Sequence, residues 1–156
     1  MIAVCDLDGT FADHSHRIHL IDGDRRKDSK NWDAFYNDDL ILKDAPIPQG
    51  IVGIRRLWNA PYVKLVLLTG RPEKTRAATR TWLKIHVSPA FEVPIYMRKP
   101  GDLKKATVYK REQVQNLIYL YPNQALIFID DDIRNYDMYR GYGLVLKAPE
   151  CWEWVR

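Results

Sequence analysis

Hydrophobic residues along this chain alternate between short continuous runs and longer amphipathic stretches. Four runs are short, apolar and bounded by polar or turn-forming residues, as expected of strands that are buried on both faces. They lie at Ile2–Cys5, Val63–Leu68, Pro94–Met97 and Leu126–Ile129. Four stretches with apolar residues at helical spacing lie at Gly50–Asn59, Pro72–His86, Ala106–Tyr121 and Ile133–Tyr142. Strands that alternate with helices predict an α/β fold, with a Rossmann-like, mainly parallel sheet flanked by helices.

The segment Phe11–Pro48 follows neither pattern. Its charged residues and aromatics are scattered without a sustained period, so we expect residues 11–48 to form a small cap or loop insertion after the first strand. Trp32, Phe35 and Tyr36 lie within it. These aromatics could stack on a nucleobase, although packing of the insertion against the rest of the protein is the commoner role of such a group. Further along, Pro72 is expected in the first turn of its helix, where its missing N–H costs nothing.

Composition narrows the class of protein. With 156 residues, 46% hydrophobic and 28% charged, the chain fits one globular domain, residues 1–156. No stretch approaches the roughly 18 apolar residues of a membrane span, and the N-terminus lacks the features of a signal peptide. Two cysteines, Cys5 and Cys151, do not make a secreted disulfide framework. We therefore expect a cytoplasmic protein without a membrane partner, and the pattern leaves its oligomeric state open.

The charge of the chain is unevenly distributed. The formal net charge is +4, but the segment Arg71–Arg111 holds 11 Lys and Arg against three acidic residues, a local balance of +8. The rest of the chain therefore carries a net negative charge. Such a basic segment favours an anionic partner, although solvated helix faces are also rich in Lys and Arg.

The first predicted strand leads into an acidic motif, Asp6-Leu7-Asp8-Gly9-Thr10. Its two carboxylates stand at the carboxyl end of a strand, where α/β sheets bind their ligands. A calcium loop of the EF-hand type would need Gly at its sixth position and Glu at its twelfth. Phe11 and Arg17 occupy those positions, so that interpretation fails. A plain acidic turn remains possible for this motif taken alone.

Two further strand ends carry polar groups. The strand Val63–Leu68 leads into Thr69–Arg71, the last predicted strand leads into Asp130–Asp132, and Lys110 falls within a helical pattern. Taken singly, Thr69 could be a turn residue, Lys110 a solvated lysine and the aspartates a helix N-cap. Their joint occurrence in this order favours one site at the carboxyl edge of the sheet.

The order of these motifs resembles that of the haloacid dehalogenase-like phosphatases, and most closely the 3′-phosphatase domain of bacteriophage polynucleotide kinase. The resemblance spans nearly the whole chain and rests on Asp-x-Asp-Gly-Thr, then Thr-Gly-Arg, then a lysine, then Ile-Asp-Asp. The closer similarity rests on Leu68–Arg71, Met97-Arg98, Gly101-Asp102 ahead of Lys110, and Met138-Tyr139-Arg140. One departure is Asp132, which stands where a basic residue is expected in the phage enzymes and so weakens the case for a polymeric substrate.

The resemblance implies a Mg²⁺-dependent phosphomonoesterase that works through an aspartyl-phosphate formed on Asp6. Asp8 would be the general acid and base, while Thr69 and Lys110 would bind the phosphoryl oxygens. The implied metal residues are Asp6, Asp8 through its backbone carbonyl, Asp130 and Asp131. The candidate substrate contacts are Gly70, Arg71, Arg17, Arg76 and Arg98. Each of these arginines could equally be an ordinary surface residue.

The resemblance and the basic segment together indicate a 3′-phosphate at a nucleic-acid end as the substrate. A 5′-nucleotidase that acts on free (deoxy)nucleoside monophosphates is the main alternative, and a non-catalytic module that binds nucleic-acid ends is another. A phospho-accepting receiver domain is disfavoured, because there the acidic pair is followed by a single aspartate in mid-chain. The sequence contains no Gly-x-x-x-x-Gly-Lys-Ser/Thr motif, so no kinase activity is expected.

Overall fold

A five-stranded parallel sheet forms the centre of the computed structural model, which describes residues 1–152 without the side chain of Arg26. The strands run in the order β5-β4-β1-β6-β7, and each neighbouring pair is parallel. Their bounds are β1 Ile2–Cys5, β4 Lys64–Pro72, β5 Ile95–Arg98, β6 Leu126–Asp130 and β7 Leu144–Lys147. The predicted α/β fold with a mainly parallel sheet is confirmed.

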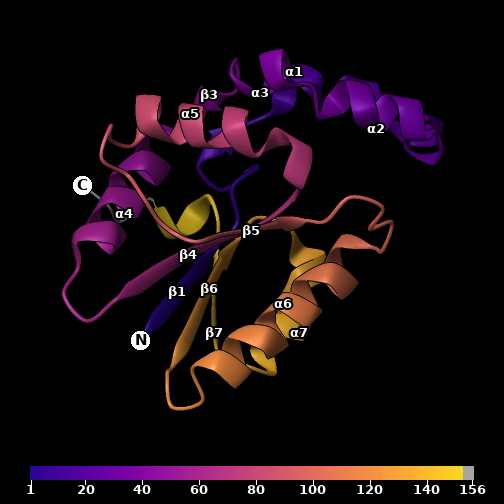
Figure 1. The fold of residues 1–156 in the computed structure, drawn as a ribbon. Helices are drawn as coiled ribbons and strands as arrows, with labels where there is room; N and C mark the ends of the chain where they lie inside the picture. The colour runs from indigo at the N-terminus through magenta and orange to yellow at the C-terminus, as the bar shows by residue number, and fades with distance from the viewer. Residues whose placement is uncertain (153–156) are drawn as a thin grey trace.

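Helices cover both faces of the sheet (Figure 1). They are α4 Pro48–Asn59 and α5 Arg76–His86 on one face, and α6 Ala106–Leu120 and α7 Ile133–Arg140 on the other. Alternate side chains of a strand point to opposite faces, so Ala3 and Cys5 pack in the core with α4 and α5, whereas Ile2 and Val4 pack with α6 and α7. Among residues 1–152, no helix is long and apolar enough to cross a bilayer.

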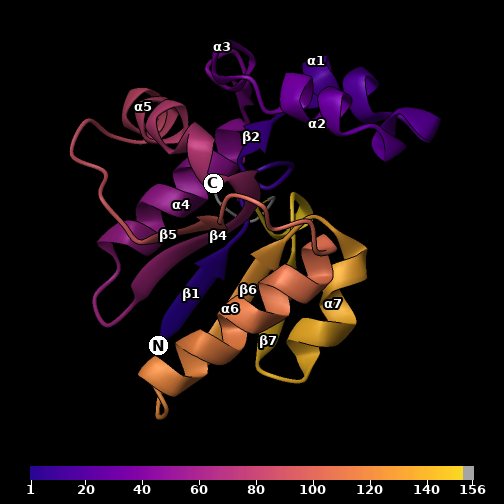
Figure 2. The ribbon, with the colours of Figure 1, turned by 45° about the vertical axis from the view of Figure 1, so that its right-hand side comes forward.

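Residues 11–47 lie between β1 and α4 and contain short elements, so the expected insertion 11–48 ends at the first residue of α4. These are β2 Ala12–Asp13, α1 Ser15–Ile18, η1 His19–Ile21, η2 Gly23–Lys27, α2 Ser29–Phe35, α3 Asp38–Ile41 and β3 Ala45–Pro46. β2 and β3 pair as a short antiparallel ribbon. In both views, α1, α2 and α3 lie beyond the carboxyl ends of the sheet strands (Figures 1 and 2). This insertion is therefore placed to border a site at that edge.

One local prediction was wrong, and one strand was not predicted. Pro72 ends β4 instead of starting a helix, and the turn η3 Glu73–Thr75 precedes α5. The chain stays extended there because an irregular pairing with β5 carries β4 on to Pro72. The strand β7 was not predicted, because it is an edge strand whose residues are only half-buried or exposed. After it, the turn η4 Glu150–Trp152 brings the indole of Trp152 to the Thr10 carbonyl, 2.8 Å away.

Candidate active site

Asp6 and Asp130 lie side by side because β1 and β6 are neighbouring parallel strands in register. The backbone N–H of Asp6 donates to the Ile129 carbonyl at 2.8 Å. Lys110 reaches both carboxylates from α6, with its Nζ 2.9 Å from Asp6 Oδ2 and 2.8 Å from Asp130 Oδ2. All three side chains are buried. The structure thus brings together three of the predicted site residues, one from each of three separate elements.

The electrostatics of this group leave an excess of negative charge. Burial raises the pKa of Asp6 well above its ordinary value, although Lys110 acts in the opposite direction. Burial alone would lower the pKa of Lys110, but Asp6, Tyr139 and Asp130 raise it well above its ordinary value. Burial and the neighbouring Asp130 raise the pKa of Asp131 to about 6. The single ammonium of Lys110 therefore faces the carboxyl groups of Asp6, Asp130 and Asp131. A further cation bound among them would be stabilised by their charge.

The donor set fits Mg²⁺, a hard cation that prefers oxygen ligands. Asp6, Asp130 and Asp131 each offer a carboxylate oxygen, and these oxygens lie within 4.8 Å of one another. The Oδ1 atom of Asp6 is buried and has no hydrogen-bond partner among the described residues. Gly9 permits this approach, since a β-carbon there would stand 2.1 Å from Asp131 Oδ2 and its φ of +76° suits glycine.

Asp130 is fixed by residues of α7. The Asn135 amide donates to both carboxylate oxygens at 3.2 Å, and the Tyr139 hydroxyl donates to Oδ2 at 3.0 Å. The sequence patterns gave no functional reason to select Asn135, which is fully buried. Asp132 has a separate role: it caps α7 through the Arg134 N–H at 3.0 Å and forms an ion pair with the Arg134 guanidinium. The N-cap interpretation therefore holds for Asp132.

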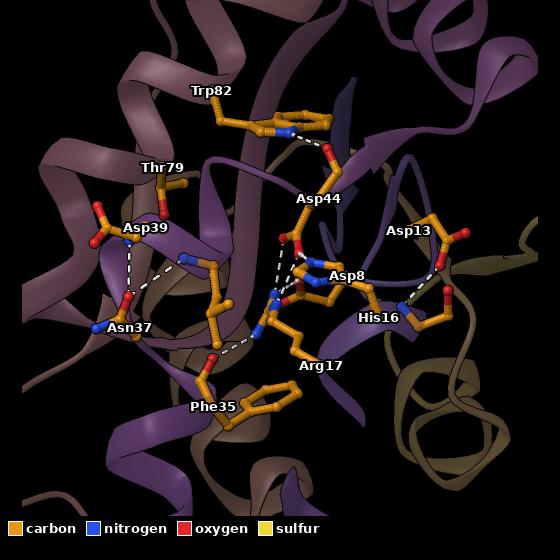
Figure 3. A network of polar contacts seen from close by, with 12 residues as sticks. Asp8, Asp13, His16, Arg17, Phe35, Asn37, Asp39, Asp44, Thr79 and Trp82 are labelled. Atoms are coloured by element: carbon orange, nitrogen blue, oxygen red, sulfur yellow. Dashed lines mark hydrogen bonds and ion pairs between the residues drawn. The ribbon is translucent and has the colours of Figure 1, made fainter. Parts of the chain in front are cut away.

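Asp8 faces a different set of partners, Arg17 and Arg71, and Figure 3 shows Arg17 beside it. Arg71 donates through Nη2 to Asp8 Oδ1 at 2.6 Å and through Nε to Oδ2 at 3.0 Å. Arg17 donates through Nη2 to Oδ1 at 2.9 Å. Burial alone would raise the pKa of Asp8, but Arg71, with help from Arg17, holds it well below its usual range. Asp8 is therefore ionised in the free protein and held in one orientation.

A second carboxylate, Asp44, completes this group and was not predicted from the sequence. Its side chain is fully buried, and Oδ2 accepts from Arg17 Nη2 at 2.8 Å and from Arg71 Nη2 at 2.6 Å. Oδ1 accepts from Arg17 Nε at 2.8 Å and lies 3.0 Å from the His16 ring (Figure 3). We call Asp8, Arg17, Asp44 and Arg71 the Arg–Asp network. It joins the insertion to the ends of β1 and β4.

The remaining predicted residues lie around these two groups. Thr69 is fully buried at the carboxyl end of β4, and its hydroxyl accepts the Arg71 N–H at 3.2 Å. Arg76 pairs with Glu73, and Arg98 donates to the Lys104 carbonyl at 2.5 Å. Arg76 and Arg98 are half-buried. The surface-residue alternative fails for Arg17 and Arg71, which are fully buried.

Comparisons with known proteins agree with this geometry. The profile of the polynucleotide kinase PNKP phosphatase domain matches residues 1–149. Two similar solved structures are the Pnkp1/Rnl/Hen1 RNA repair complex, with a TM-score of 0.65, and the Pnkp1/Rnl/Hen1 complex, with a TM-score of 0.63. Both matches have 21% sequence identity and cover 94% of this chain. This chain in turn spans only 42% and 45% of the length of the two matched chains. At 21% identity, these two matches show only that this chain shares their fold.

Sequence comparison with curated proteins gives no match. The family profile nevertheless covers nearly all of the chain and includes the ends of β1, β4 and β6, which carry the site. The chain therefore belongs to the haloacid dehalogenase-like family of polynucleotide kinase PNKP phosphatase domains.

Proposed function

We propose that the protein is a Mg²⁺-dependent phosphomonoesterase that removes 3′-phosphates from nucleic-acid ends. One observation carries this proposal: the buried Asp6–Lys110–Asp130 group stands two residues from Asp8, which two buried arginines hold in place. This arrangement supplies a nucleophile, a positive charge for the phosphoryl oxygens and an oriented acid–base group. The family and the basic segment Arg71–Arg111 support a nucleic-acid substrate.

In the first step, a carboxylate oxygen of Asp6 attacks phosphorus and forms an aspartyl-phosphate. The bond between phosphorus and the leaving oxygen breaks, its electron pair stays with that oxygen, and Asp8 donates the proton that makes it a hydroxyl. Lys110 and Thr69 would bind the phosphoryl oxygens. When bound by Asp6, Asp130 and Asp131, Mg²⁺ supplies positive charge that offsets the charge of the phosphate. In the second step, Asp8 takes a proton from the water that hydrolyses the aspartyl-phosphate.

Because the pKa of Asp8 is low, the proton that Asp8 donates must first come from another group. Arg71 and Arg17 keep Asp8 ionised in the free protein at neutral pH, so Asp8 must gain a proton before it donates one. A phosphate monoester has a second pKa of about 6, so its monoanion carries such a proton. The negative charge of a bound phosphate also raises the pKa of a nearby carboxyl group. We propose that the substrate delivers the proton to Asp8 as it binds.

The proposed function is tested by hydrolysis of a 3′-phosphorylated oligonucleotide, measured as release of inorganic phosphate. We expect turnover that depends on added Mg²⁺, stops with a chelator and is abolished by Asp6→Asn, because an amide is neither a nucleophile nor an anionic ligand. Asp137→Asn is the matched control, since Asp137 is 93% exposed on α7, and it should retain full activity. Turnover that survives both the chelator and Asp6→Asn would refute the proposal.

A further inference from the structure

Tyr36 follows α2 and extends from the insertion toward the end of β4. Its hydroxyl lies 3.7 Å from the point where a β-carbon on Gly70 would stand, and it is the one atom within 4 Å of that point among the described residues other than Gly70 and its two chain neighbours. Gly70 separates Thr69 from Arg71, so the hydroxyl stands above the stretch of β4 that contributes to the site. Tyr36 and Gly70 are both half-buried. The insertion therefore places a tyrosine beside the proposed phosphate site.

The surroundings of the Tyr36 hydroxyl are charged, yet it has no hydrogen bond with any described residue. Burial, followed by the charge of Asp8, raises its pKa to about 12, while Arg98, Arg17 and Arg71 act in the opposite direction. These four residues are therefore the charged groups that act on this phenol. The phenol stays protonated at neutral pH and has both a donor and an acceptor to offer to a ligand.

Phe35, the last residue of α2, and Tyr36, directly after it, have different roles. Phe35 is buried, and its ring lies 4.2 Å from the Arg17 guanidinium, so it packs against the Arg–Asp network. Tyr36 stacks on Trp32 with ring centres 5.9 Å apart and planes at 24°, and it forms a T-shaped pair with Phe35, with ring centres 4.9 Å apart. The Tyr36 ring is thus fixed before any substrate arrives, which lowers the entropic cost of binding to it.

We propose that Tyr36 binds the terminal nucleoside, the group that carries the phosphate. This inference rests on the proposed function. The leaving oxygen must come within hydrogen-bond reach of Asp8 to accept its proton, and the sugar is bonded directly to that oxygen. Asp8 contacts Arg71, which follows Gly70 in β4, so the nucleoside lies close to the point where the Tyr36 hydroxyl stands over Gly70. The ring gives the base a stacking face, and the hydroxyl forms a hydrogen bond with the nucleoside.

The test compares two substrates in each variant: a 3′-phosphorylated oligonucleotide and glycerol phosphate, which has no base. The measured quantity is the ratio of kcat/KM for the oligonucleotide to kcat/KM for glycerol phosphate. Tyr36→Ala should lower this ratio by about 5- to 150-fold, the effect of losing one stacked base. Tyr36→Phe keeps the ring and should lower it by about 2- to 12-fold, the effect of one hydrogen bond. Tyr119→Ala, at a tyrosine 86% exposed on α6, is the matched control and should keep the wild-type ratio.

The outcomes separate this inference from the proposed function. An active wild-type protein, together with a Tyr36→Ala variant that folds and keeps the wild-type ratio, would overturn the role of Tyr36 alone. If Tyr36→Ala does not fold, Tyr36→Phe decides, and a wild-type ratio in that variant likewise overturns the role. A wild-type protein that hydrolyses neither substrate would refute the proposed function and, with it, this inference.

Discussion

Substitution of Asp44 by asparagine perturbs the Arg–Asp network at a fully buried carboxylate. The carboxylate accepts three hydrogen bonds from Arg17 and Arg71 and has no solvent exposure. Asparagine has the same shape but no charge. Its amide N–H groups would face the N–H groups of the two guanidiniums, and two donors cannot form a hydrogen bond with each other. Removal of one partner from a buried ion pair costs about 3–5 kcal/mol. For a domain of this size, each kcal/mol shifts Tm by about 2–4 °C, so Asp44→Asn should melt about 6–20 °C below the wild type.

Activity should fall as well, for a separate reason. Without Asp44, both arginines have only Asp8 as a carboxylate partner, so Asp8 should move from its present orientation. An ångström-scale misplacement of a catalytic group costs on the order of 10²-fold in rate. We therefore expect kcat on a 3′-phosphorylated oligonucleotide to fall far more than KM changes, in assays at a temperature where the variant is folded.

The control for this experiment is Asp39→Asn, because Asp39 is an exposed carboxylate in the same insertion. It should change neither Tm nor kcat measurably. Thermal unfolding followed by circular dichroism, together with steady-state kinetics, measures both effects. Wild-type values of Tm and kcat in Asp44→Asn would show that Asp44 is not the residue that holds Arg17 and Arg71.

Three further predictions concern the chemistry. Asp8→Asn should lower kcat by about 10²–10⁴-fold, as expected when general acid–base catalysis is lost; full activity would show that Asp8 is not the acid. Lys110→Met leaves two buried carboxylates without their ammonium partner, so this variant should have a lower Tm than the wild type. Added Mg²⁺ should raise the Tm of the variant more than that of the wild type, and an equal rise in both proteins would contradict this prediction. Finally, kcat/KM should decline as pH rises above about 6, since the phosphate then loses the proton that Asp8 needs; a rate that rises through this range would exclude delivery by the substrate.

The parallel sheet was predictable because its inner strands are buried on both faces. Ile2–Cys5 is apolar at every position, and the structure buries all four residues. The side-by-side placement of Asp6 and Asp130 followed from the rule that parallel strands present their carboxyl ends at one edge. That rule needs only the strand boundaries, which the apolar runs indicated.

The Arg–Asp network could not be predicted in the same way. Asp44 lies in the insertion between Lys43 and Ala45, and no periodicity marks it as buried. Arg17 and Arg71 were treated as candidate substrate contacts, but each guanidinium is engaged by carboxylates. Burial of an arginine depends on partners that lie far away in the chain, and such partners are visible only once the insertion has folded over the sheet.

The proposed function is the hydrolysis of 3′-phosphates on nucleic-acid ends. Its most direct test is kcat/KM for a 3′-phosphorylated oligonucleotide, a 3′-mononucleotide and a 5′-mononucleotide, each at two salt concentrations. We predict the highest value for the oligonucleotide and a clear decrease with salt for that substrate alone, because its neighbouring phosphates release counterions when they meet the basic segment Arg71–Arg111. A preference for the 5′-mononucleotide would contradict the claim and favour a nucleotidase with the same phosphoryl chemistry.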